Sequence, residues 1–239
     1  MTGLLAGFLS SCQNPLTIND NPVRKAPATD FYGEPTVELA AAIRDHDVST
    51  TQRLLNTGRY DLGDRGERDM PLTLYASAVG NFDGLRQLLA AGASANDVCD
   101  IGHGPMSLLE VAVGSKDDRF METLMDFGAS PNGVPGTDPP IFRAIMAEEW
   151  GRMEKLLAAG ADINRIDSGG RPPIRVLALL NKYDKVLFLL ERGADPDVGI
   201  ETKNDLVSIM EVFPLSPSTD AGEWQQRVRV FLKERKVRN

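Results

Sequence analysis

Three short stretches hold side chains of the kinds that catalyse reactions. The run DRGERD at residues 64–69 places carboxylates beside guanidiniums, but carboxylates do acid–base work only when their surroundings separate their pKa values. His103 can act as a base, yet no acid or nucleophile adjoins it in the sequence. Cys99 lacks the basic neighbours that lower the pKa of a thiol. We therefore predict a solvated loop for the charge run and no catalytic role for His103 or Cys99.

Metal, cofactor and nucleic-acid binding are not predicted either. The chain has two cysteines, Cys12 and Cys99, and two histidines, His46 and His103, without the spacing of metal ligands. Its net charge of −8 argues against nucleic acid as a partner, because phosphate contacts need a basic surface. The sequence thus predicts a protein that is not an enzyme and that needs no cofactor.

One phrase recurs along the chain and indicates how it folds. The phrase LLAAGASAN at 88–96 has near copies at 54–62, 124–132, 156–164 and 189–197. Its glycines are 34, 36, 32 and 33 residues apart, and they are Gly58, Gly92, Gly128, Gly160 and Gly193. A period of this length is typical of stacked repeats, in which each unit buries its apolar face against its neighbours.

The unit that begins at Pro71 contains two helical patterns. Apolar residues follow the i, i+3, i+4, i+7 spacing over 72–79, and a second apolar stripe runs over 82–89. Pro71 suits the first turn of the first helix, and Gly92 suits the end of the second. The same order after Pro35, Pro140 and Pro173 predicts a proline at the start of each first helix. The unit from Pro105 to Gly128 has three extra residues, which we assign to a longer turn between its helices near 114–118.

The repeated phrase LLxxGA-D/S-x-N/D, with a proline 20 residues before the glycine in two units, resembles the ankyrin-repeat family over about residues 35–204. The openings EPTV, MPLT, GPMS, PPIF and PPIR keep that family's proline but lack its threonine and histidine. The resemblance implies an all-α ankyrin-repeat solenoid of about five helix-turn-helix repeats. It also implies a concave face, formed by the loops between repeats and the adjacent first helices, where a partner protein binds.

Charged residues in these loops are the candidates for partner contact. By the resemblance, the loop tips fall near 62–69, 96–104, 132–138, 165–171 and 198–204. Each residue also has a plainer interpretation as a solvated loop position. The candidates are Asp64, Arg65, Arg68, Asp97, Asp100, His103, Asp138, Arg165, Asp167 and Arg171.

Residues 1–12, MTGLLAGFLSSC, resemble a bacterial lipoprotein signal. Leu9-Ser10-Ser11-Cys12 matches a lipobox, which implies cleavage before Cys12 and a lipid on its thiol. No basic residue precedes Cys12, so two alternatives stay open: a start upstream of Met1, or a chance apolar N-terminus. If the signal is real, Gln13 after the cysteine favours an outer-membrane lipoprotein facing the periplasm. The alternative location is the cytoplasm.

Both ends of the repeat region have a predicted role. Residues 13–34 have the composition of a linker and predict a disordered tether with a span of about 26 Å. Residues 205–239 predict capping helices, with Asp220–Glu223 resembling a capping box at the start of the last one. The last seventeen residues carry a net charge of +4, which fits the polar outer face of a terminal repeat or a basic patch.

These patterns favour a non-enzymatic, monomeric scaffold that is tethered by lipid in the bacterial envelope and binds a partner protein. A sharper version is an immunity protein that neutralises a toxin delivered to the envelope. A cytosolic ankyrin adaptor is a second alternative, and an accessory subunit of an enzyme is a third.

Overall fold

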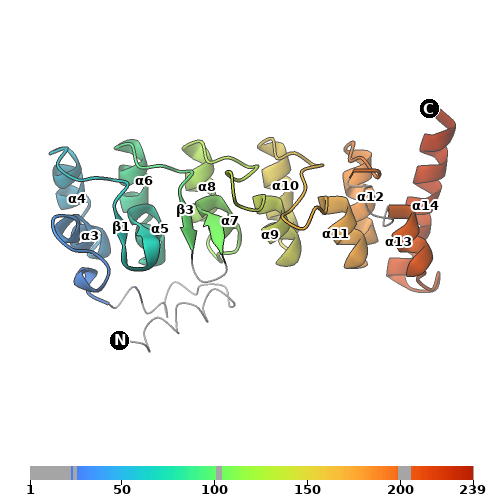
Figure 1. Cartoon of the computed structure of the whole chain (residues 1–239), viewed down its shortest axis with the longest axis horizontal. Coiled ribbons are helices and arrows are strands. Elements are labelled where there is room, and N and C mark those ends of the chain that lie inside the picture. Colours follow the sequence, from blue (N-terminus) through green and yellow to red (C-terminus); the bar gives the residue numbers. More distant parts are fainter. Residues whose placement is uncertain (1–22, 24–25, 101–103, 199–205, 239) are drawn as a thin grey trace. The chain divides into compact units, whose positions relative to one another are not determined.

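Paired helices make up most of the computed structural model, which describes residues 23, 26–100, 104–198 and 206–238 (Figure 1). Cys12 and His103 lie outside the described residues. The chain divides into two compact units, Met1–Arg143 and Ala144–Asn239. The division falls within α9 (Pro140–Met146).

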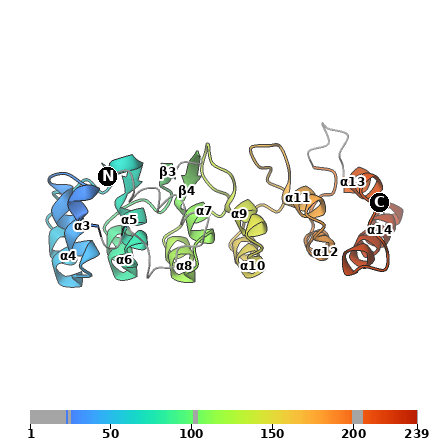
Figure 2. The ribbon, with the colours of Figure 1, turned by 90° about the horizontal axis from the view of Figure 1, so that it is seen from below.

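The first unit stacks three helix pairs. In order they are α3 (Thr36–Arg44) with α4 (Val48–Leu55), α5 (Leu72–Ala78) with α6 (Phe82–Ala90), and α7 (Leu108–Val113) with α8 (Asp118–Asp126). Figure 2 shows the first helices of these pairs in one layer and the second helices in another. The sides that face each other bury large apolar residues with almost no exposure, including Leu39, Ile43, Leu72, Val79, Leu85, Leu88, Leu108 and Met121.

Two short antiparallel hairpins stand between the helix pairs of this unit. In the first, β1 (Arg65–Gly66) pairs with β2 (Met70–Pro71), and the 3-10 turn η2 (Glu67–Asp69) joins them. In the second, β3 (Val98–Asp100) pairs with β4 (Pro105–Ser107). The predicted helical fold is therefore confirmed, with loops that form strand pairs in two places.

The second unit continues the pattern of paired helices. It contains α10 (Trp150–Ala158), α11 (Pro173–Leu179) with α12 (Tyr183–Glu191), and α13 (Leu206–Val212) with α14 (Asp220–Arg238). Two of the basic side chains of α14 bind carbonyl oxygens: Arg229 donates to Met210 at 2.6 Å and Arg235 to Ala194 at 3.2 Å. These arginines therefore join the last helix to the elements before it.

The start of α14 differs from the predicted capping box. The Thr219 hydroxyl accepts a hydrogen bond from the Gly222 N–H at 3.1 Å, and Asp220 is already the first helical residue. The cap is therefore Thr219, one residue before the predicted position. Threonine caps a helix in the same way as aspartate, by accepting from a backbone N–H that has no intrahelical partner.

The five repeated glycines end the second helices as predicted. Each has a positive φ, between 64° and 106°, which glycine adopts without steric cost. In four repeats the alanine after the glycine donates its N–H to a leucine carbonyl five residues earlier, as Ala93 does to Leu88 at 3.0 Å. This bond closes a Schellman motif. The four alanines are also buried, which favours a small side chain after the glycine.

The prediction of a proline at the start of each first helix is right in two repeats and wrong in three. Pro35 is the residue before α3. Pro140 and Pro173 are the first residues of α9 and α11. Pro71 lies in β2 and Pro105 in β4, so α5 begins one residue later than predicted and α7 begins at Leu108. The three extra residues of the third repeat are thus strand residues before the helix. The inter-helix turn at 114–117 is only one residue longer than that at 79–81.

The packed domain begins earlier than residue 35. Phe31 and Tyr32 are buried, and their rings lie 5.4 Å and 5.3 Å from the ring of Tyr75 in α5. The Tyr32 hydroxyl donates to the Met70 carbonyl at 2.9 Å. The prediction of a disordered tether over 13–34 is therefore wrong for residues 26–32, because two aromatic side chains within a proline-rich stretch cover the first repeat.

Candidate interaction surface

The polar residues of the repeated phrase shape each loop. The Asp or Ser two positions after the glycine accepts a hydrogen bond from the N–H two residues further on, as Asp162 does from Asn164 at 2.9 Å. The same bond forms at Ser94, Ser130 and Asp195. Such turns fix the chain direction directly after the helix. In these four repeats the phrase therefore forms a fixed turn directly after the second helix.

The asparagine that ends the phrase links one loop to the next. In the first unit, Asn96 accepts from the Ser130 N–H at 2.7 Å and donates to the Gly128 carbonyl at 3.1 Å. In the second unit, Asn164 accepts from the Asp195 N–H at 2.8 Å. Each bond crosses one repeat, so neighbouring loops hold a fixed spacing.

Arg65 joins the two hairpins of the first unit. Its guanidinium donates to the Val98 carbonyl at 2.6 Å and contacts Asp97 at 3.4 Å. Burial raises the pKa of the half-buried Asp97, while Arg65 lowers it. One carboxylate oxygen of Asp97 is buried and has no hydrogen-bond partner among the described residues. Arg65 and Asp97, both predicted to touch a partner, thus bind each other first.

The other candidates in the first unit lie in different settings. Asp64 is half-buried and accepts a hydrogen bond from the Thr36 hydroxyl. Asp100 is exposed at the end of β3 and accepts from the Gly104 N–H at 3.2 Å. Asp138 is half-buried in the loop before α9. Only the backbone of Arg68 is described, within η2, and His103 lies outside the described residues.

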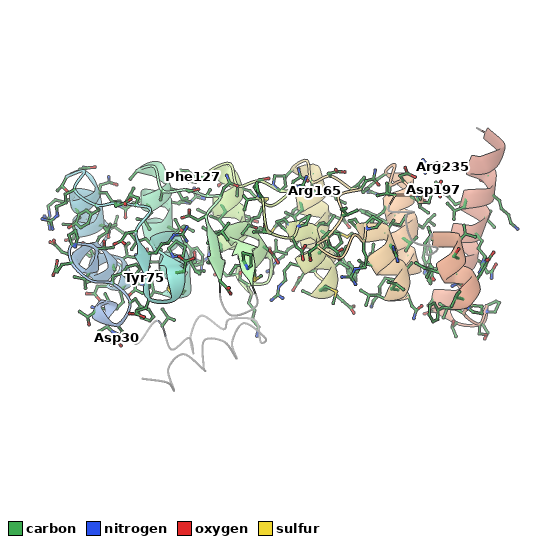
Figure 3. The ribbon with its side chains drawn as sticks, viewed as in Figure 1. Asp30, Tyr75, Phe127, Arg165, Asp197 and Arg235 are labelled. Atoms are coloured by element: carbon green, nitrogen blue, oxygen red, sulfur yellow. The ribbon has the colours of Figure 1, made fainter. Side chains whose placement is uncertain are left out.

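In the second unit, Asp167 and Arg171 close their own loop. Asp167 is 8% exposed, and its carboxylate accepts from the N–H groups of Gly169 and Arg171 at 2.9 Å and 2.8 Å. The Arg171 guanidinium pairs with the same carboxylate at 2.7 Å. Arg165, labelled in Figure 3, is exposed. Four described candidates are thus exposed, namely Arg65, Asp100, Arg165 and Arg171, and two of them, Arg65 and Arg171, are engaged in ion pairs.

Glu110 in α7 is a titratable group that the sequence analysis missed. Burial raises its pKa to about 7, and nearby Asp138 raises it as well, while Arg143 and a backbone hydrogen bond at Ser107 lower it. One carboxylate oxygen of Glu110 is buried with no hydrogen-bond partner among the described residues. Ser107 is the N-cap of α7 and accepts from the Glu110 N–H at 3.2 Å. The sequence signal was the S-x-x-E pattern of a capping box.

Comparisons with known proteins agree on the architecture. No protein-family model matches the sequence. Neurogenic locus notch homolog protein 2 of Homo sapiens is 31% identical over 128 residues, which is 52% of this chain and only 5% of that protein. The crystal structure of an ankyrin repeat domain from Acinetobacter baumannii is 18% identical, with a TM-score of 0.61 over 79% of this chain and 95% of that chain. This chain has the ankyrin-repeat fold.

A third similar structure comes from a complex of two proteins. It is a chain from the complex of a predatory endopeptidase of Bdellovibrio bacteriovorus with an immunity protein. The identity is 20% and the TM-score 0.56, over 80% of this chain and 97% of that chain. At this identity the likeness establishes the shared ankyrin fold.

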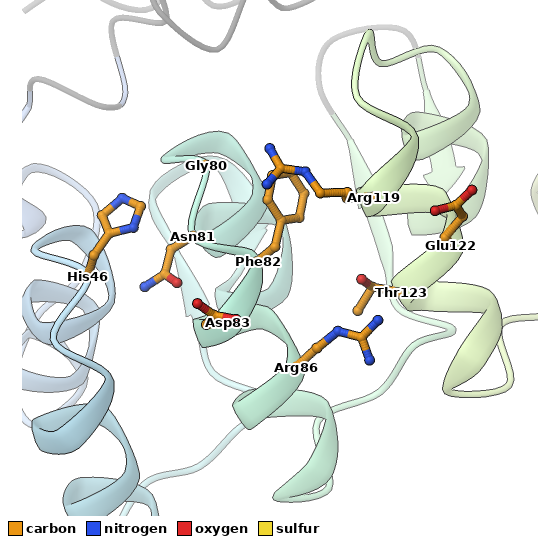
Figure 4. Close-up of a pocket in the computed structure, with 9 residues that line it drawn as sticks. All are labelled: His46, Gly80, Asn81, Phe82, Asp83, Arg86, Arg119, Glu122 and Thr123. Atoms are coloured by element: carbon orange, nitrogen blue, oxygen red, sulfur yellow. The ribbon is translucent and has the colours of Figure 1, made fainter.

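A polar groove of about 340 Å³ lies at the inter-helix turns of the first three ankyrin repeats (Figure 4). Its Arg119 stacks on the Phe82 ring at 4.4 Å and pairs with Asp117 at 2.6 Å. Asn81, which is 2% exposed, donates to the Ile43 carbonyl and accepts from the Gly84 N–H, both at 2.7 Å. Its lining also includes His46 and Thr123. The contacts of Arg119 with Phe82 and of Asn81 with Ile43 hold adjacent repeats together.

Cys99, the described cysteine that the sequence analysis considered as a reactive thiol, is buried inside a hairpin. Cys99 is 1% exposed, and its thiol contacts the Met106 carbonyl at 3.8 Å across the β3–β4 hairpin. Within the described residues, no group of three His, Cys, Asp or Glu side chains is arranged to hold a metal ion. In the same part of the chain, no helix has the length and apolar content that crossing a bilayer requires.

Proposed function

We propose that this chain is a non-enzymatic scaffold that binds a partner protein through the loop side of its ankyrin repeats. The observation that supports it most is the set of bonds between consecutive loops, made by Arg65, Asn96 and Asn164. Loops held at a fixed spacing lose little conformational entropy on binding, which favours affinity. The residues between these bonds are then free to differ and to determine which partner fits.

A charge exchange on the loops tests this proposal. Asp100→Lys with Arg165→Glu reverses two exposed loop charges and leaves the net charge unchanged. We expect at least a tenfold loss of affinity for a partner identified by crosslinking in the native cells, since rim charges set orientation and encounter. Affinity is measured by isothermal titration calorimetry on the purified pair.

The matched control exchanges charges on the second helices. Arg53→Glu in α4 with Glu191→Lys in α12 changes the same two charge types at exposed positions away from the loops. We expect this variant to keep affinity within about twofold, as surface substitutions outside an interface usually do. Equal losses in both variants would show that binding does not depend on the loops.

A second candidate function is immunity against a toxin. The structural similarity to a chain from an endopeptidase–immunity protein complex favours it, and residues 1–222 carry a net charge of −12, which suits a basic toxin. Co-expression with the product of an adjacent toxin gene should restore growth. Growth arrest that persists at equal expression would reject immunity and leave the general scaffold proposal standing.

We further propose that a lipid on Cys12 tethers the chain in the bacterial envelope, on the outer membrane facing the periplasm. The lipobox-like Leu9-Ser10-Ser11-Cys12 supports it. We expect the wild type in the membrane fraction and Cys12→Ala in the soluble fraction, because one diacylated, N-acylated cysteine supplies the apolar surface for anchoring. The same soluble fraction for both proteins would instead support a cytosolic adaptor.

A further inference from the structure

An apolar stripe runs along one edge of the first helices in the second unit. Met146, Leu179 and Val212 are the last residues of α9, α11 and α13, and they are spaced by 33 residues. They are 63%, 46% and 67% exposed. Leu180 and Phe213, the residues directly after two of them, are 38% and 56% exposed. We call these five residues the apolar stripe.

The fold does not require exposed apolar residues at this position. In the first unit the last residues of α3, α5 and α7 are Arg44, Ala78 and Val113, and Ala78 and Val113 are 3% and 0% exposed. Five of the nine large apolar side chains exposed in the described chain belong to the stripe. A contiguous exposed apolar surface of this kind marks an interaction site more often than chance.

Two contacts within the second unit fix helix ends that carry the stripe. Lys182 pairs with Glu148 at 2.7 Å, which joins the turn after α11 to the turn after α9. The Phe213 carbonyl accepts a hydrogen bond from Gln225 of α14 at 3.0 Å. Packed helices lie about 8–10 Å apart, so consecutive members of the stripe recur at about that interval. Seven residues of an α-helix advance about 10.5 Å. Apolar residues seven positions apart on a partner helix therefore recur at nearly the same interval as the members of the stripe.

Two exposed acidic residues stand close to members of the stripe in the sequence. Glu149 and Glu211 are exposed, and neither has an ion-pair partner among the described residues. Lys182 is neutralised by Glu148, and it also lies 5.8 Å from the centre of the Trp150 ring. A partner that covers the stripe therefore gains from apolar side chains flanked by basic ones.

We propose that the apolar stripe binds an amphipathic α-helix of a partner protein, with apolar residues every seven positions and lysine or arginine beside them. This inference rests on the proposed binding function and assigns a second surface and the chemistry of its ligand. The helix lies across the ends of α9, α11 and α13, with its basic residues near Glu149 and Glu211.

A designed peptide tests the proposal directly. The probe is a helical peptide of about 21 residues, or three heptads, with leucine on one face and lysine on its flanks. Binding to the full chain is measured by fluorescence anisotropy. We expect Met146→Ser, Leu179→Ser and Val212→Ser together to weaken binding at least tenfold. The matched control, Val48→Ser, Phe127→Ser and Val230→Ser, removes three exposed apolar side chains elsewhere and should change binding less than twofold.

Charge provides a second readout that loss of folding cannot imitate. A peptide with glutamate in place of lysine should bind the wild type at least tenfold more weakly. The variant Glu149→Lys with Glu211→Lys should reverse this preference. Equal binding of both peptides, or unchanged binding by the triple serine variant, overturns the proposal.

Two other occupants of the stripe have distinct signatures. A concentration-dependent dimer that the triple serine variant abolishes, measured by sedimentation, would assign the stripe to a second copy and overturn the helix proposal. If the chain binds vesicles of anionic lipid and the triple serine variant does not, the stripe binds a membrane surface, and the helix proposal is overturned. If the charge exchange on the loops abolishes partner binding while these stripe tests fail, the proposed function stands and this inference alone falls.

Discussion

Replacing Tyr75 with alanine is expected to lower the free energy of unfolding by about 3–5 kcal/mol, the usual cost of deleting a large buried aromatic ring. Tyr75 has no exposed surface, and its ring contacts those of both Phe31 and Tyr32. The substitution leaves a cavity that rigid neighbours only partly fill. It also removes the surface on which residues 26–32 pack. Urea unfolding followed by far-UV circular dichroism measures the loss.

Tyr75→Phe is the matched control. The Tyr75 hydroxyl is buried without a hydrogen-bond partner among the described residues, and burial raises its pKa to about 12. Removing it therefore gives up no bond, and we expect stability to stay within about 1 kcal/mol or to rise. Hydrogen exchange at residues 26–32 should accelerate in the alanine variant only. Unchanged exchange there would contradict the assignment of this segment to the core of the first repeat.

The repeat architecture could be predicted because local chemistry recurs at a fixed interval. Each marked glycine takes a positive φ, and the alanine after it is held by a backbone bond to the second helix. Both requirements act within six residues, so they are visible in the sequence. The order of two helices and a loop follows from them without knowledge of distant contacts.

The predicted element boundaries failed where a second local signal competed with proline. Pro71 and Pro105 belong to strands, because a proline fixed near φ −65° also suits an extended chain. The start of α7 is set by Ser107, whose hydroxyl caps the helix. The S-x-x-E pattern that ends at Glu110 was the better guide to this start.

The candidate contact residues were harder to predict, because their availability depends on contacts between repeats. Arg65 reaches Val98, 33 residues away, and Asp64 accepts from Thr36, 28 residues away. Neither pairing leaves a local mark in the sequence. The apolar stripe is visible in the sequence as a pattern, since Met146, Leu179 and Val212 share the 33-residue period. The sequence does not show that these residues are exposed, because buried apolar residues follow the same period.

Glu110 gives the protein an expected dependence of stability on pH. Its pKa is raised from 4.5 to about 7 in the folded chain, first by burial and then by Asp138. Between these two values the folded state therefore binds more protons than the unfolded state. The free energy of unfolding should fall as pH rises from about 4.5 to about 7 and then level off. We expect a loss of about 1–3 kcal/mol, reduced from the full linkage value because the carboxyl group is partly exposed to solvent.

Glu110→Gln should remove this dependence while keeping the amide side chain in place of the carboxyl group. At pH 8 the variant is expected to be about 1–3 kcal/mol more stable than the wild type, and at pH 4.5 nearly equal to it, because the wild-type side chain is then largely neutral in the folded state. Glu67→Gln, at an exposed position in the same unit, should shift stability by less than about 0.5 kcal/mol at either pH. The free energy of unfolding of the wild type and of both variants is measured by urea titration at pH 4.5 and pH 8. A Glu110→Gln chain that is less stable than the wild type at pH 8 would mean that the ionised carboxylate is bound by a cation, and that Arg143 outweighs burial and Asp138 together.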